Sequence, residues 1–258
     1  MVTRTVLIVA SAGTMFLCVP SFAESPFGAP PGKGVSVAVD TAAAGETGPV
    51  RLAQGKKRAI YRPPLRGAPT RRVGGATRGD QEWDLVLSVL APEQTGLTAD
   101  PSPELYWYLS RPDDRPAVFA LIRDDRVEPV VELDLGAPSA GGMGMVALAD
   151  AGVRLEPGVV YEWSIALVTD PEARSKDVVS SATLTRRPLG ETLRRDLDGA
   201  DPLGQAALYA GAGYWYDAIA VLSADIGRGI DVAELRPVRA DLCAQVGLED
   251  AASFDRAH

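Results

Sequence analysis

Paired carboxylates are the residues of this sequence whose type and spacing could do chemistry. Two carboxylates can hydrolyse a glycosidic bond when they flank it at a separation of roughly 5–10 Å. The acid pairs are Asp113/Asp114, Asp124/Asp125, Glu132/Asp134 and Asp196/Asp198. Glu132 and Asp134 would share one face of a strand, but alternating acids are usual on the solvent face of an antiparallel sheet. Asp-Asp pairs are favoured in turns for backbone reasons. We therefore interpret all four pairs as structural, and a carboxylate-based hydrolase is the least favoured hypothesis.

Histidine and cysteine are too scarce for most other catalytic sites. The only histidine among the 258 residues is His258, and the two cysteines are Cys18 and Cys243. This scarcity excludes a Ser-His-Asp triad, a Cys-His pair and a metal site built on histidine or cysteine. Cys243 lies in a helical pattern, where a lone thiol usually acts as a small buried apolar side chain. We expect no catalytic residue, cofactor or metal, and hence a protein that is not an enzyme.

Aromatic side chains offer a binding chemistry instead. Tyr106 and Tyr108 would lie on the same face of a strand, where exposed rings could stack on sugars as in carbohydrate-binding modules. Trp215 and Tyr216 form a second aromatic group in a helical region. Both groups are candidate binding residues, although aromatic rings more often fill a core or the junction between a sheet and helices. We favour core packing for both, and keep polysaccharide binding as the alternative function.

Basic residues form a third candidate binding region. Residues 51–79 contain nine Lys and Arg and no acid, whereas residues 80–258 contain 15 Lys and Arg against 31 Asp and Glu. A basic segment could touch an anionic membrane surface or wall polymer, or it could lie along the acidic body or remain solvated, which we favour. We expect no nucleic-acid partner for an exported protein. The candidate binding arginines are Arg62, Arg66, Arg71, Arg72 and Arg78.

The N-terminus has the three parts of a secretory signal peptide. Arg4 precedes a mostly apolar run over residues 6–19, and small residues lead to an expected cleavage site after Ala23. A helix of that length would rise about 21 Å, less than the roughly 30 Å of a bilayer core, so a retained membrane anchor is the less favoured alternative. We expect a periplasmic or secreted protein, with a Pro- and Gly-rich disordered arm over 24–57 and a basic lead-in over 58–79.

Alternating apolar residues predict a β-rich domain over residues 80–187. In one strand Trp83, Leu85, Leu87 and Val89 share a face. The predicted strands cover residues 82–90, 104–110, 117–122, 127–133, 144–148, 159–168 and 178–184. Seven short strands with frequent turn signals favour an immunoglobulin- or fibronectin-like β-sandwich. The sequence LEPG at 155–158, followed by Tyr161, resembles a fibronectin type III corner in which a tyrosine hydroxyl bonds back to the backbone.

Residues 188–258 change to a helical period, which makes the chain α+β overall. Asp201-Pro202 is a helix start, and helices are predicted over about 202–210, 214–226 and 231–246. Asp231 and Glu234 have the spacing of a capping box. Tyr209, Gly213, Trp215 and Ala218 resemble a tetratricopeptide hairpin, but one such unit cannot form a solenoid. We predict a helical hairpin or a three-helix segment.

Several phrases in a fixed order carry a family resemblance. They are YRPPLRGAP at 61–69, RRVGGATRG at 71–79, LYWYL at 105–109, LEPG at 155–158 and YAGAGYWYDA at 209–218. Together they resemble a bacterial exported family known as domain of unknown function 928, over about residues 61–248. The sequence departs from the family pattern at Ala76, at residues 181–183 and at residues 236–238. The resemblance implies that the Pro-rich stretch from residue 61 belongs to the folded unit, and it implies no activity.

The favoured hypothesis is a non-catalytic exported interaction module. It would combine a β-sandwich with a C-terminal helical segment and bind another envelope protein or a cell-wall component. Support comes from the missing histidine and cysteine chemistry and from the scaffold, although a fold alone is only an analogy for function.

Overall fold

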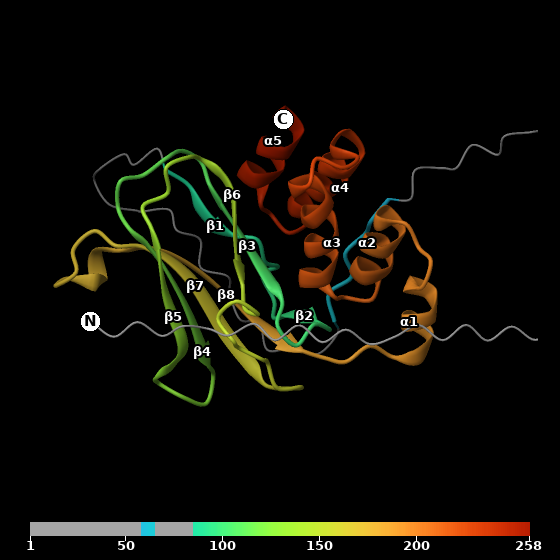
Figure 1. The fold of residues 1–258 in the computed structure, drawn as a ribbon, viewed down its shortest axis with the longest axis horizontal. Coiled ribbons are helices and arrows are strands. Elements are labelled where there is room, and N and C mark those ends of the chain that lie inside the picture. Colours follow the sequence, from blue (N-terminus) through green and yellow to red (C-terminus); the bar gives the residue numbers. More distant parts are fainter. Residues whose placement is uncertain (1–57, 65–84) are drawn as a thin grey trace, which may run out of the picture. The chain divides into compact units, whose positions relative to one another are not determined.

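Two sheets and a group of helices make up the part of the chain that the structure describes. The computed structural model describes residues 58–64 and 85–258, which belong to one compact unit, Leu52–His258. The strands are β1 (Leu87–Val89), β2 (Gly96–Thr98), β3 (Glu104–Leu109), β4 (Ala117–Arg123), β5 (Pro129–Gly136), β6 (Gly142–Ala147), β7 (Val160–Leu167) and β8 (Val178–Arg186). Each of the seven predicted strands overlaps an observed one, and β2 is an additional strand (Figure 1). Residues 82–84 of the first predicted strand lie outside the described residues.

The strands form a three-stranded and a five-stranded sheet. Their orders are β1-β3-β6 and β2-β8-β7-β4-β5. All neighbours are antiparallel except β2 and β8, which are parallel. Hairpins join β4 to β5 and β7 to β8, whereas at every other connection between consecutive strands the chain passes to the other sheet. The predicted turn between β4 and β5 is closed by a hydrogen bond from the Arg126 amide to the Arg123 carbonyl at 3.0 Å.

Alternation along the strands explains which side chains fill the core. In β7 Tyr161, Trp163 and Ile165 are buried, whereas Glu162 between the first two is exposed. β3 departs from this pattern, because five of its six residues are buried. One face of β3 packs into the sheets and the other contacts α3. A strand between a sheet and helices reads as a continuous apolar run rather than as an alternation.

The turn before β7 contains the tyrosine hydrogen bond that its sequence suggested. Gly158 adopts a φ of +78°, a conformation that glycine takes without steric cost. Tyr161 is buried, and its hydroxyl accepts a hydrogen bond from the amide of Glu156 at 3.1 Å. This bond connects the beginning of β7 to the loop that precedes it.

Five α-helices follow the strands, and the structure thus mixes β-sheets with helices as the sequence predicted. They are α1 (Glu191–Leu197), α2 (Pro202–Gly211), α3 (Trp215–Gly227), α4 (Val232–Gln245) and α5 (Glu249–Ala257). α3 contacts β2 and β3, and α5 contacts β6. The three predicted helices correspond to α2, α3 and α4, whereas α1 and α5 were not predicted.

The N-terminal caps of α2 and α4 were both predicted from the sequence, and only the first is present. Asp201 caps α2 as predicted, because its carboxylate accepts the amide of Gly204 at 2.7 Å. The predicted capping box of α4 is wrong. Asp231 has a φ of +45° and makes no side-chain cap bond, and its carbonyl instead accepts the amide of Glu234. A left-handed residue cannot point its side chain at the first turn in the way that an extended cap does.

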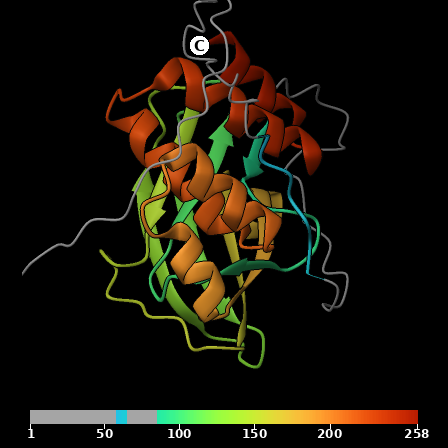
Figure 2. The same ribbon diagram turned by 90° about the vertical axis from the view of Figure 1, so that its right-hand side faces the viewer.

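Residues 58–64 lie in an extended conformation against the helices (cyan in Figure 2). The amide of Tyr61 donates to Gln245 of α4 at 2.9 Å, and the Gln245 amide group donates to the carbonyl of Ala59 at 3.0 Å. The Tyr61 ring meets the Trp215 ring edge-on, with centroids 5.0 Å apart. This part of the expected basic lead-in therefore belongs to the folded unit. The expected signal peptide and arm, residues 1–57, lie outside the described residues.

Candidate functional site

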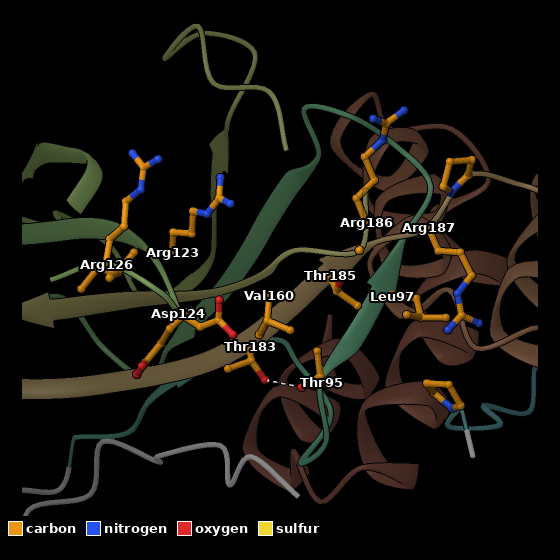
Figure 3. A pocket seen from close by; sticks show the side chains of 15 residues that line it. Thr95, Leu97, Arg123, Asp124, Arg126, Val160, Thr183, Thr185, Arg186 and Arg187 are labelled. Atoms are coloured by element: carbon orange, nitrogen blue, oxygen red, sulfur yellow. Dashed lines mark hydrogen bonds between the residues drawn. The ribbon is translucent and has the colours of Figure 1, made fainter. Parts of the chain in front are cut away.

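A basic groove lies on the face of the five-stranded sheet that points away from the three-stranded sheet. Its volume is about 630 Å³. Figure 3 shows Arg123 and Arg126 on one side, Arg186 and Arg187 on the other, and Val160, Thr183 and Thr185 between them. The remaining lining residues are Pro64, Thr95, Leu97, Ile122, Asp124, Gly158, Glu162 and Pro188.

Strand register explains why arginines distant in the sequence line one groove. β4 ends at Arg123, opposite the start of β7, and the turn that follows carries Arg126. The same end of β7 pairs with the end of β8, where Val160 lies opposite Thr185 and Arg186 is the last strand residue. The antiparallel arrangement of β4, β7 and β8 therefore brings the C-terminal ends of β4 and β8 to the same end of the sheet, on either side of the start of β7.

The four arginines differ in how far their charge is already neutralised. Arg123 is 2.7 Å from carboxylate oxygens of both Asp125 and Glu156. Arg186 instead lies over the carbonyl oxygens of Ala99 and Leu155, at 3.4 and 3.3 Å. Among the described residues, no carboxylate forms an ion pair with Arg126, Arg186 or Arg187.

The floor of the groove is held by the sheet and by hydroxyl contacts. The hydroxyl groups of Thr95 and Thr183 are 2.9 Å apart and share a hydrogen bond (dashed in Figure 3). Thr183 also accepts a hydrogen bond at its carbonyl oxygen from the hydroxyl of Tyr216 at 3.1 Å. The groove thus has a hydrogen-bonded floor with arginines at both ends.

The tyrosines considered as a sugar platform are not exposed. Tyr106 and Tyr108 keep only 9% and 7% of their surface. The Tyr106 hydroxyl donates to Glu104 at 2.5 Å, and burial is the main cause that raises its pKa. The Tyr108 ring lies against Phe254 of α5, with centroids 5.7 Å apart. The structure therefore places both rings in the core, as the favoured interpretation expected.

Trp215 and Tyr216 are likewise buried at the junction of sheet and helices, in line with the core packing favoured for them. The Trp215 indole donates to the carbonyl of Leu90 at 2.8 Å. The Tyr216 hydroxyl accepts from the Trp163 indole at 3.0 Å. Gly96 makes room for this ring, because a Cβ there would lie 2.7 Å from it. Both side chains thus connect α3 to the sheet region.

The other sequence candidates divide into exposed and undescribed residues. Arg62 is exposed, and only its backbone amide is engaged, by the carbonyl of Ala210 at 3.0 Å. Arg66, Arg71, Arg72 and Arg78 lie outside the described residues. Sequence reasoning missed the groove arginines. The signal was available, since Arg123 and Arg126 flank a predicted hairpin turn and Arg186-Arg187 follow the last predicted strand.

The acid pairs do not converge on a common point. Asp113 forms an ion pair with Arg115 at 2.7 Å, and this hydrogen-bonded pairing lowers its pKa. Glu132 and Asp134 are exposed on β5, at the edge of the sheet, and Asp134 accepts the amide of Gly136. Asp125 binds Arg123 in the turn. These contacts agree with the structural interpretation of the pairs.

A second hollow, of about 530 Å³, lies between β6 and α3. Asp100, Glu104, Asp150 and Asp217 are among its lining residues. Asp217 accepts the amide of Ala99 with both oxygens, at 3.0 and 3.2 Å. Burial raises the pKa of Asp217 to about 6, against the lowering effect of these bonds. Asp217 thus anchors the loop after β2 to α3.

Neither a metal centre nor a membrane-spanning helix occurs in the described part of the chain. Residues 58–64 and 85–258 contain no group of three or more His, Cys, Asp or Glu side chains placed to hold a metal ion. No helix within these ranges is both long enough and apolar enough to cross a bilayer.

Comparison with known proteins yields a family. A search of the curated proteins finds no match for the chain. The sequence pattern of a family described as Domain of Unknown Function (DUF928) matches residues 73–255, well over half of the chain. This match includes the strands, the groove arginines and most of the helices described above. The chain therefore belongs to the DUF928 family.

Proposed function

We propose that this chain is a non-catalytic, exported interaction module that binds another envelope protein or envelope component. The observation that carries this proposal is the preformed basic groove on the five-stranded sheet. Three of its four arginines form no ion pair with described residues, although acids outnumber bases two to one in the surrounding chain. Cationic groups held apart from available carboxylates favour binding of an external anionic group.

We also propose that the two sheets form a fibronectin-like sandwich that presents this groove. The strand order supports this, because the chain passes repeatedly between a three-stranded and a five-stranded sheet, as in Greek-key sandwiches. The hydrogen bond from the Glu156 amide to the Tyr161 hydroxyl gives further support. The α2–α3 hairpin, which resembles a tetratricopeptide unit, would then brace one end of the sandwich.

Export would place this module in the periplasm or outside the cell. The support is the charged start, the short apolar run and the small residues before Ala23. The basic residues of 51–79 would add contact with anionic membrane surfaces. Intact-mass measurement of the protein recovered from the producing bacterium should show the loss of residues 1–23. Recovery of the uncleaved chain would contradict this part of the proposal.

Affinity purification tests the binding function directly. The full chain carrying a C-terminal tag would be expressed in its own bacterium, cross-linked, and recovered from the envelope fraction. The expected result is one reproducible protein or polymer that is absent from a parallel purification of an unrelated exported protein with the same tag. A recovery indistinguishable from that control would overturn the proposed function.

A further inference from the structure

We propose that the basic groove binds a short acidic peptide segment of a partner protein, through carboxylate side chains held between its two pairs of arginines. This inference rests on the proposed function and names the chemistry of the ligand. The groove arginines are Arg123, Arg126, Arg186 and Arg187.

Charge distribution is the first argument. Residues 80–258 contain 31 acids and 15 bases, yet the groove is lined by four arginines and only two acids, Asp124 and Glu162. Because Asp125 and Glu156 already pair with Arg123, the positive charge of the groove rests on Arg126, Arg186 and Arg187, against Asp124 and Glu162. Such a basic site in an acidic protein attracts anions locally, while the rest of the surface repels them. It also disfavours the chain's own basic segment as the occupant.

The positions of the arginines are the second argument. Arg126 and Arg187 are exposed and lie on opposite sides of the floor (Figure 3). Arg186 is half-buried and held by two carbonyl oxygens, which fixes its guanidinium without neutralising it. A guanidinium group pairs with a carboxylate through two parallel hydrogen bonds. Two separated cationic ends fit a ligand that carries at least two carboxylates along an extended chain.

The lining between the arginines is the third argument, and it favours a peptide over a glycan. None of the fifteen lining residues, all of them described, is aromatic, so the floor offers no ring on which a sugar could stack. Leu97, Ile122 and Val160 supply apolar surface, and the threonines supply hydroxyl groups. A groove of about 630 Å³ has the size of sites that bind small ligands, and alternating acidic and apolar side chains would match this mixed lining.

Fluorescence anisotropy with the full chain tests the inference. The probe is a labelled six-residue peptide that alternates Glu with Val, and the control peptide carries Gln in place of Glu. We expect the Gln peptide to bind at least tenfold more weakly, because it lacks the charge that the arginine fork recognises. Affinity for the acidic peptide should also fall as salt rises.

Matched variants locate the site. The double variant R126Q/R187Q should weaken binding of the acidic peptide at least tenfold. The control R111Q removes an exposed arginine beyond the opposite end of β4, and should change the affinity less than twofold. Equal thermal unfolding of all variants would show that the loss is not a folding defect. Equal loss in R111Q and in the double variant would contradict the assignment.

Competition separates this ligand from other anions. Polygalacturonate or inorganic phosphate that binds more tightly than the acidic peptide would overturn the peptide assignment, as would equal binding of the Glu and Gln peptides. If R126Q/R187Q still captures the envelope partner of the wild-type chain, the inference fails and the proposed function stands. If neither chain captures a partner and no peptide binds, both fail.

Discussion

Replacing Asp255 with alanine should destabilise the helical part of the protein severely. Arg239 of α4 donates to both carboxylate oxygens of Asp255 in α5, each at 2.7 Å, and its third contact reaches Ser223 of α3 at 2.8 Å. The two charged side chains keep 3% and 0% of their surface. Three helices therefore converge on one buried ion pair, and Asp255→Ala would leave a guanidinium buried without its main counter-charge.

The magnitude follows from this burial. Removing one member of a buried ion pair costs about 3–5 kcal/mol, because the remaining charge stays desolvated. Whole domains are stabilised by only about 5–15 kcal/mol. Removing both charges in Arg239→Met/Asp255→Leu should recover most of the loss, since apolar groups of similar volume replace the pair. The exposed ion pair between Asp241 of α4 and Arg256 of α5 provides a control, and Asp241→Ala should cost less than about 1 kcal/mol.

Urea unfolding followed by tryptophan fluorescence measures these differences, because Trp163 and Trp215 are fully buried. The effect of Asp255→Ala should be nearly independent of salt, since solvent ions do not reach the pair. The reasoning would be refuted if Asp255→Ala cost less than about 1 kcal/mol. It would also be refuted if the double variant were no more stable than Asp255→Ala.

Three further perturbations test other parts of the structure. Gly144→Ala should lower the free energy of unfolding in urea by about 1–3 kcal/mol, because the added Cβ would lie 2.2 Å from the Trp107 ring. The double variant Gly144→Ala/Trp107→Leu should recover part of this loss. An unchanged free energy of unfolding in Gly144→Ala would contradict the packing. Tyr161→Phe should lower stability by about 1 kcal/mol by leaving the Glu156 amide without its partner; an unchanged urea midpoint would argue against a role for this bond. Burial raises the folded pKa of Asp217 from 3.8 to about 6, so its contribution to stability is greatest below its unfolded pKa and is lost as pH rises through about 6. Asp217→Asn should therefore lose less stability than wild type between about pH 4 and pH 7, by up to about 3 kcal/mol, and parallel pH profiles would contradict this.

Strand positions were predictable from the sequence because burial repeats every second residue in most of them. The strand β2 was not. β2 has three residues, all buried, and pairs in parallel with β8, so it shows no alternation and its partner is distant in the sequence. The missed helices α1 and α5 are also short. α5 contains Asp255, whose partner Arg239 could not be identified without the fold.

The groove was hidden from sequence reasoning for a different reason. The charge pattern of the sequence pointed to residues 51–79, because nine basic residues occur there without an acid. The groove arginines are instead two pairs separated by about sixty residues, and the first pair flanks two aspartates. Only the register of β4, β7 and β8 brings them together. The local sequence of β3 likewise does not show that helices cover its second face, which is why exposure of Tyr106 and Tyr108 stayed an alternative to core packing.

The segment at 58–64 has a practical consequence for how this domain can be excised. The family match begins at residue 73, yet Tyr61 packs on Trp215 and Gln245 bonds to the backbone of residues 59 and 61. A chain trimmed to residues 73–255 would expose an edge of the Trp215 indole. It would also leave the Gln245 side chain without its hydrogen-bond partners at residues 59 and 61. The smallest autonomous unit therefore begins upstream of the boundary that sequence matching draws, and shorter versions should aggregate where longer ones stay monodisperse.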